Sequence, residues 1–234
     1  MMMFVTGLCY TQGRFEISVS IGYSHPLLEA YGGRITINNA LDQIFIDGKR
    51  IIVSDRLGAT KGYSIHSIFK YNFFRQGYLK GVVNVGYNIL YNSVDLGKDY
   101  DPGVRIQSFS VGGGAEISPI KSGRFYPSVH ALLRTNFIGG ETFYAAGIDF
   151  FKVTPRYGYT AGLSLNYLLK NNLGMFLSYS YSFDNAWGRR TDETPPDETR
   201  TVVFRDKANG TNGLSGDRRI AYWAVSLGMN FLFK

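Results

Sequence analysis

The sequence predicts an all-β fold: an eight-stranded antiparallel up-and-down transmembrane β-barrel with long loops at one end and short turns at the other. The first indication is the segment 219–234, where apolar residues such as Trp223, Leu227 and Phe231 alternate with small or weakly polar ones. This is the two-residue period of a strand, and from 221 to 233 neither face carries the lysines and glutamates of a solvated sheet. The second is that no run of about 18 apolar residues occurs, so no membrane-spanning helix is expected. The third is that the same alternation recurs in seven segments upstream.

The composition supports a single β-rich domain. The chain has 234 residues, of which 44% are hydrophobic and 18% charged, and this excludes disorder as the global state. Its 17 Tyr, 17 Phe and 28 Gly favour a β architecture with aromatic side chains at a membrane interface. The net charge of +7 is spread over several connections and forms no basic face, so no nucleic-acid partner is expected.

Residues 1–12 are interpreted as a signal-peptide remnant, and the barrel is expected to occupy 13–234. The segment is short, apolar and followed at once by a strand pattern, although it lacks the basic start of a secretory signal. An ordered N-terminal strand extension is the alternative. The single cysteine, Cys9, has no partner for an internal disulfide.

The first strand is predicted at 15–24, where aromatic and aliphatic residues alternate with Glu16, serines and a glycine. Pro26 is expected to end it, because proline cannot donate to a strand ladder. Downstream, Asp47-Gly48 between two apolar runs predicts a hairpin. Its arms are too short to cross a membrane, so the hairpin is placed above the barrel rim.

Six further strands are expected before the terminal one, at 62–73, 79–92, 106–118, 125–137, 156–169 and 175–184. Their connections alternate between short turns and longer loops, of which 138–155 and 185–216 are long, as antiparallel strands of a barrel require. Aromatic residues gather in two bands. The band at the short-turn end holds Tyr71, Phe73, Tyr78, Phe125, Tyr167, Phe231 and Phe233, and the band toward the loops holds Tyr23, Tyr63, Tyr91, Phe137, Tyr157, Phe183 and Trp223.

These features resemble the eight-stranded outer-membrane β-barrel domain family, the small barrels of the OmpA and OmpX kind. The resemblance covers residues 14–234 and depends on the strand pattern, the RFYPSV start of the fifth strand and the aromatic end NFLFK. It implies the outer membrane of a Gram-negative bacterium, outer-membrane lipid such as lipopolysaccharide as a partner, and recognition by the barrel-assembly machinery through Phe231 and Phe233. Lys234 after the final phenylalanine departs from the usual pattern. A soluble lipocalin-like barrel is the rival fold, with its apolar faces pointing inward.

An eight-stranded barrel is just wide enough for side chains to fill it, so a wide pore is not expected. On the inward register, Glu16, Lys70, Lys80 and Glu116 fall at the short-turn end of adjacent strands. We expect them to form one lumen charge network, because unpaired buried charges are unfavourable. Structural ion pairs are one interpretation, and a gate or proton path is the other. Further polar lumen residues are His66, His130, Arg134, Arg156 and Asp184.

No pattern predicts a catalytic site, a metal site or a cofactor. The three histidines have no serine and acid at the same predicted height, and no His, Asp and Glu residues have metal-ligand spacing. The glycines of VGGGAE lie inside a strand and lack the Lys-Ser/Thr of a phosphate loop, so they are assigned to close packing or barrel curvature. An enzyme is therefore not expected.

The loops are the remaining candidates for function. The first and fourth are long and charged, and their aromatic residues Tyr31, Phe45, Trp187 and Phe204 are the candidate binding residues. The sequence thus favours a structural or interaction role through extracellular loops, with a protein partner there as one candidate. The alternatives are a lipid-modifying outer-membrane enzyme, a small gated channel, or an accessory subunit of a larger outer-membrane complex.

Overall fold

The computed structural model describes residues 14–30, 43–46, 49–52, 59–74, 78–92, 103–119, 124–144, 147–191, 201–208 and 217–233. The expected signal-peptide remnant at 1–12, the loop residue Tyr31 and the C-terminal Lys234 lie outside these ranges. Eight long strands are β1 (Phe15–Leu27), β4 (Lys61–Asn72), β5 (Leu79–Tyr91), β6 (Gly103–Ile117), β7 (Phe125–Tyr144), β8 (Gly147–Lys170), β9 (Leu173–Trp187) and β11 (Ala221–Phe233). Three short strands are β2 (Gln43–Ile46), β3 (Lys49–Ile52) and β10 (Thr201–Val203).

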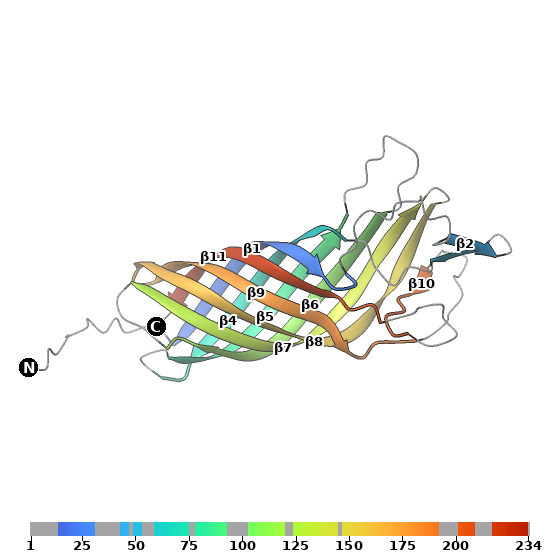
Figure 1. The fold of residues 1–234 in the computed structure, drawn as a ribbon. Coiled ribbons are helices and arrows are strands. Elements are labelled where there is room, and N and C mark those ends of the chain that lie inside the picture. Colours follow the sequence, from blue (N-terminus) through green and yellow to red (C-terminus); the bar gives the residue numbers. More distant parts are fainter. Residues whose placement is uncertain are drawn as a thin grey trace, which may run out of the picture.

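The eight long strands form a closed barrel (Figure 1). Each pairs antiparallel with its neighbours, and closure comes from β11, which pairs with β9 on one side and with β1 on the other. Phe15 at the start of β1 lies opposite Phe233 at the end of β11, so the first and last strands meet at the turn end. The predicted eight-stranded up-and-down barrel is confirmed. Among the described residues, no helix is long and apolar enough to span a bilayer.

The two faces of the strands have opposite character. Apolar side chains point outward and are exposed, for example Leu133 at 67% and Ile21 at 66%. Polar side chains point inward and are buried, for example Ser18 and Asn136 at 0%. A soluble barrel would require the reverse arrangement, so the lipocalin-like alternative is excluded and the exterior is suited to lipid.

The first strand and the third loop differ from the sequence prediction. β1 continues through Pro26, which pairs with Tyr222 of β11. On its other side, the pairing of β1 with β4 ends two residues earlier, at Ser24. Proline is tolerated there because only one side of the strand needs a ladder. The expected long loop at 138–155 is mostly strand, since β7 and β8 stay paired as far as Tyr144 and Gly147.

A bulge accommodates this extension of β7 and β8. The register shifts between Ile138 and Gly140, and a Cβ atom at Gly140 would fall only 2.1 Å from the carbonyl oxygen of Arg105 on β6. Glycine is therefore needed where the backbones approach so closely. Gly139 and Gly140 interrupt the alternation in the sequence, so the sequence alone predicts a loop where this part of the hairpin forms.

Two short pairings lie at the loop end of the barrel. β2 and β3 form the predicted hairpin, in which Ile46 pairs with Lys49, and Figure 1 shows it beyond the barrel rim. β10 pairs in parallel with β8, where Thr201 lies opposite Phe150. The second pairing brings part of the last loop back over the barrel mouth.

Candidate functional site

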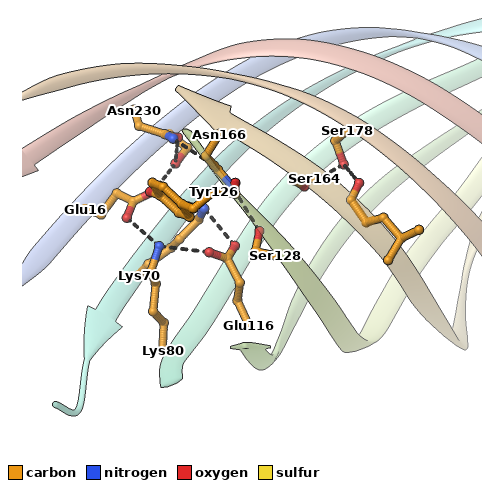
Figure 2. Close-up of polar contacts among 12 residues, drawn as sticks. Glu16, Lys70, Lys80, Glu116, Tyr126, Ser128, Ser164, Asn166, Ser178 and Asn230 are labelled. Carbon is orange, nitrogen blue, oxygen red and sulfur yellow. Dashed lines mark hydrogen bonds and ion pairs between the residues drawn. The ribbon is translucent and has the colours of Figure 1, made fainter. Parts of the chain in front are cut away.

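Four charged side chains form a closed ring of ion pairs inside the turn end of the barrel (Figure 2). Glu16 of β1 pairs in register with Lys70 of β4, and Lys80 of β5 pairs with Glu116 of β6. Lys80 Nζ lies 2.8 Å from a carboxylate oxygen of each glutamate. Lys70 Nζ lies 3.0 Å from Glu16 Oε1 and 2.8 Å from Glu116 Oε2. Each lysine bridges both glutamates, so this ring, which we call the lumen tetrad, carries no net charge.

Uncharged polar side chains fill the rest of the cross-section beside the tetrad (Figure 2). Ser18 Oγ donates to Asn230 Oδ1 at 2.7 Å, and Asn230 Nδ2 donates to Asn166 Oδ1 at 3.3 Å. Asn166 Nδ2 in turn donates to Ser128 Oγ at 3.0 Å. The buried ring of Tyr126 has its centroid 5.9 Å from one of the lysine ammonium groups. The turn end is thus filled by side chains from most of the barrel strands.

A small cavity of about 50 Å³ lies deeper in the lumen, lined in part by His66, His130 and Arg134. Each histidine lies against a glycine of the neighbouring strand. A Cβ at Gly86 would fall 2.3 Å from His66 Nδ1, and one at Gly162 would fall 2.8 Å from the His130 ring. These glycines therefore make room for the imidazoles. The cavity holds a few water molecules at most and is too small to be an open passage.

A second group of polar residues lies toward the loop end of the lumen. Arg134 of β7 forms an ion pair with Asp184 of β9, and both side chains are almost completely buried. Tyr222 Oη, on β11, lies 3.4 Å from an Arg134 terminal nitrogen and 3.3 Å from Asp184 Oδ1. Asn136 Nδ2 donates to the Asp184 carbonyl oxygen at 2.7 Å. Side chains from three strands are thereby tied together across the lumen.

Arg156 of β8 holds a residue of the last loop inside the barrel mouth. Its Nε lies 2.8 Å from Asp206 Oδ2, and one terminal nitrogen lies 2.9 Å from Asp206 Oδ1. The same carboxylate accepts from Asn185 Nδ2 at 2.8 Å and from the backbone N–H of Arg190 at 2.8 Å. Arg156, Asp206 and Asn185 are all 0% exposed. We call these four donors with Asp206 the mouth site.

An apolar cluster surrounds the mouth site. Phe204 is 1% exposed, and its ring centroid lies 5.3 Å from that of Phe151 on β8. It packs with inward aliphatic residues near the loop ends of the strands, including Leu90, Ile106 and Ile138. The segment 201–208 therefore closes the loop end of the lumen with an apolar side chain and a buried ion pair.

The structure brings some predicted site residues together and separates others. The four tetrad residues meet, as do Arg134 and Asp184, whereas the partner of Arg156 is Asp206, which lies in a loop without periodicity. Tyr222 and Asn185 also act in the lumen although the sequence did not single them out. Tyr222 has the phase of an inward residue in its strand, so the alternation could have indicated its place in the lumen. For Asn185 the alternation gives no such signal.

The loop and assembly candidates have different outcomes. Phe204, a candidate binding residue of the last loop, is buried, and its ring packs in the barrel mouth instead of lying on the loop surface. Trp187 is 56% exposed, and Phe231 and Phe233 are exposed on the outer face. β2 includes Phe45, but the side chain of Phe45 lies outside what the structure describes. Within the described residues, no group of three or more His, Cys, Asp and Glu could hold a metal ion.

Comparisons with known proteins give structural neighbours only. No protein-family model and no curated protein matches the chain. Among solved structures, Neisserial surface protein A (NspA) superposes with a TM-score of 0.50 and 14% identity over 94% of this chain and 97% of that chain. Ail, the attachment invasion locus protein of Yersinia pestis, superposes with a TM-score of 0.43 and 14% identity over 94% and 99% of the two chains. Ail in complex with the heparin analogue sucrose octasulfate gives 0.42 and 14% over 93% and 99%.

The likeness to NspA extends over almost the whole of both chains and concerns the fold. It agrees with the closed sheet of eight antiparallel strands and with the apolar exterior of the barrel. The chain therefore has the fold of the small eight-stranded outer-membrane β-barrels.

Proposed function

We propose that this protein is located in the outer membrane of a Gram-negative bacterium, where its barrel is a closed scaffold for binding loops. The observation that carries the proposal is that side chains fill the lumen toward both ends. The tetrad occupies the turn end, and Phe204 with the Arg156–Asp206 pair occupies the loop end. A barrel with no passage through it presents its surfaces as the parts that can contact other molecules.

The arrangement of the lumen supports a non-enzymatic role. Its charged groups are arranged as compensated pairs, and its two histidines lie against glycines inside the wall. A catalytic serine, histidine and acid would need to meet at a place that a substrate can reach. The cavity beside His66 and His130 measures about 50 Å³, which is smaller than an ordinary ligand pocket.

Two kinds of partner follow from the outer surface. Lys61 lies at the loop end of β4, with Nζ 5.3 Å from the centroid of the Tyr91 ring, and the exposed Lys152 lies near the loop end of β8. Cations beside an aromatic band are suited to the phosphates of outer-membrane lipid such as lipopolysaccharide. At the opposite end, Phe231 and Phe233 on the outer face of β11 are the proposed signal for the barrel-assembly machinery.

The loop-end partner is the central part of the proposal, and crosslinking tests it. A photo-reactive amino acid at Trp187 should capture a discrete protein in native outer membranes, because this side chain is 56% exposed at the end of β9. The matched control is the same probe at Leu133, which is 67% exposed on the lipid face. Identical adducts from both positions, or none from Trp187, would contradict a loop-based interaction.

Electrical recording separates the closed scaffold from a small gated channel. The purified protein in planar bilayers should show no stepwise conductance, because the tetrad blocks the lumen at the turn end and the mouth site blocks it at the loop end. Reproducible single-channel steps at modest voltage would favour the channel. Turnover of a lipid substrate in detergent would likewise favour a lipid-modifying enzyme.

A further inference from the structure

The mouth site has the composition of a receptor for one carboxylate group. Four donors converge on the two oxygens of Asp206: Nε and a terminal nitrogen of Arg156, the side-chain amide of Asn185 and the backbone N–H of Arg190. The fork of an arginine matches a carboxylate in two parallel hydrogen bonds. The site is shielded from water, since Arg156 and Asn185 are 0% exposed.

The barrel holds most of these donors in place independently of Asp206. Arg156 lies on β8, and its other terminal nitrogen donates to the Pro155 carbonyl oxygen at 3.0 Å. Asn185 lies on β9, where its Oδ1 accepts from the backbone N–H of Ile220 at 2.7 Å. This hydrogen bond fixes which end of the amide faces the carboxylate. The donors therefore form a preorganised cationic site at the rim of a rigid scaffold.

The group that fills the site belongs to a connection between strands. Asp206 follows β10, and the backbone around it is held by further contacts: its N–H donates to the Arg190 carbonyl oxygen at 3.2 Å, and its carbonyl oxygen accepts from Arg218 at 3.1 Å. Phe204, two residues earlier, enters the apolar cluster. The Asp206 carboxylate therefore holds the segment 201–208 across the lumen together with the β10–β8 pairing and a hydrogen bond of 3.1 Å from Arg156 to the Phe204 carbonyl oxygen.

We propose that the mouth site is an oxyanion receptor that the chain occupies with its own Asp206, and that this contact latches the segment 201–208 as a lid over the lumen. The tethered carboxylate has an effective concentration of about millimolar or above, so a dilute free anion does not displace it. A carboxylate or phosphate presented by a ligand bound at the loop end would compete for the same donors. The inference adds a conformational switch to the barrel and does not depend on the identity of a loop partner.

Chemical rescue tests the receptor directly. The full chain carrying Asp206→Ala is refolded from urea into detergent micelles in sodium formate or in sodium chloride at equal ionic strength. Hydrogen–deuterium exchange of the segment 201–208, measured in the folded protein, should be several-fold faster than in the wild type in chloride, and formate should slow it saturably. Formate supplies the missing carboxylate, whereas chloride lacks its planar pair of oxygens. If the variant does not fold at all in chloride, the folded fraction, read as the heat-modifiable band on gels, is titrated with formate instead and should rise saturably.

Two controls separate a receptor from a general effect of formate. Glu141→Ala removes a carboxylate that pairs with the partly exposed Arg105, and exchange of the segment 201–208 in this variant should not depend on formate. Adding Arg156→Gln to Asp206→Ala removes the fork, and the formate response should disappear. The proposal is overturned if the segment 201–208 of Asp206→Ala exchanges as slowly in chloride as that of the wild type, if formate does not slow its exchange, or if the Glu141→Ala variant responds equally.

Discussion

A lysine ammonium group inside the barrel is stable only where carboxylates replace the water that it has lost. The side chain of Lys80 is 0% exposed and lies 2.8 Å from a carboxylate oxygen of both Glu16 and Glu116. Removing one partner leaves an uncompensated buried charge, which typically destabilises a protein by about 3–5 kcal/mol. Removing an opposite pair leaves the remaining lumen neutral, so the combined loss should be smaller than the sum of the two single losses.

A double-mutant cycle measures this coupling at the tetrad. For Glu16→Gln and Lys80→Met we expect a coupling free energy of about 0.5–3 kcal/mol in urea unfolding from lipid vesicles. The control cycle uses Arg105 and Glu141, an ion pair whose arginine is 45% exposed, and should give about 0–1 kcal/mol. Additive free energies for Glu16 and Lys80 would show that the lumen charges act independently.

A surface ion pair gives a prediction about pH. Arg219 Nε donates to Glu29 Oε2 at 2.7 Å, and this hydrogen bond lowers the pKa of Glu29 below its ordinary value. A lowered pKa means that the stabilisation is present above the pKa of the unfolded chain and is lost as the pH falls through the folded value. In an NMR titration, Arg219→Gln should raise the pKa of Glu29, while Arg189→Gln should leave it unchanged. The pair is partly exposed, so its effect on stability is small.

The sequence predicts contacts between individual side chains only where both residues lie on strands with a regular inward and outward alternation. Glu16, Lys70, Lys80 and Glu116 could be placed together because alternation gives their direction and chain order gives their height. Asp206 could not, because its loop has no period and nothing in its neighbourhood relates it to Arg156. The sequence does not predict the burial of Phe204 for the same reason: a loop that folds into the barrel has the composition of one that points to solvent.

The strands present a lipid-facing surface whose tolerance to charge should depend on depth. Leu163 and Val153 both point outward from β8, with 59% and 63% exposure, and ten residues of strand separate them by about 33 Å. Leu163→Arg should destabilise the barrel by about 2–4 kcal/mol near the bilayer midplane, and Val153→Arg by about 0–1 kcal/mol at the loop end. Urea titration in vesicles measures both. Equal losses would mean that the membrane does not lie across the middle of β8.

Two adjacent glycines of β6 should respond differently to the same change. A Cβ at Gly114 would fall 2.0 Å from the Ala131 carbonyl oxygen, whereas one at Gly113 would meet only the Val82 carbonyl oxygen at 3.6 Å. Gly114→Ala should therefore destabilise by about 1–3 kcal/mol through a forced backbone shift. Gly113→Ala should change stability by less than about 1 kcal/mol. Similar unfolding free energies for the two variants would contradict the close packing assigned to Gly114.

Strand existence was easier to predict than strand length. The six barrel strands between Lys61 and Trp187 and the two terminal ones all follow the alternation, because each has one face toward lipid and one toward the lumen. The sequence does not predict the extension of β7 and β8 beyond Phe137, since Gly140 and Pro155 are turn signals when the tertiary structure is unknown. In the structure Gly140 lies at a bulge. Pro155 lies beyond the β8–β9 pairing, which extends only as far as Tyr157 and Trp187.

The two ends of the lumen are closed by different means. The tetrad consists of strand residues alone and belongs to the barrel wall. The mouth is closed by Asp206 and Phe204, which are carried by a connection between strands. Opening the turn end would require the wall itself to deform, whereas opening the mouth requires only that the segment 201–208 leaves its site. Any conformational change of functional use is therefore expected at the loop end.

The closed barrel also predicts how the isolated chain folds. In hydrocarbon, every backbone N–H and C=O must be paired within the protein, and a sheet satisfies this requirement only when its edges join, as β1 and β11 do here. The purified chain should therefore fold into detergent or lipid as a species rich in β structure. Unheated samples should migrate on gels apart from heated ones, and circular dichroism should report strands. A mainly helical spectrum, or a folded chain that stays soluble without detergent, would contradict a barrel whose outer face is made for lipid.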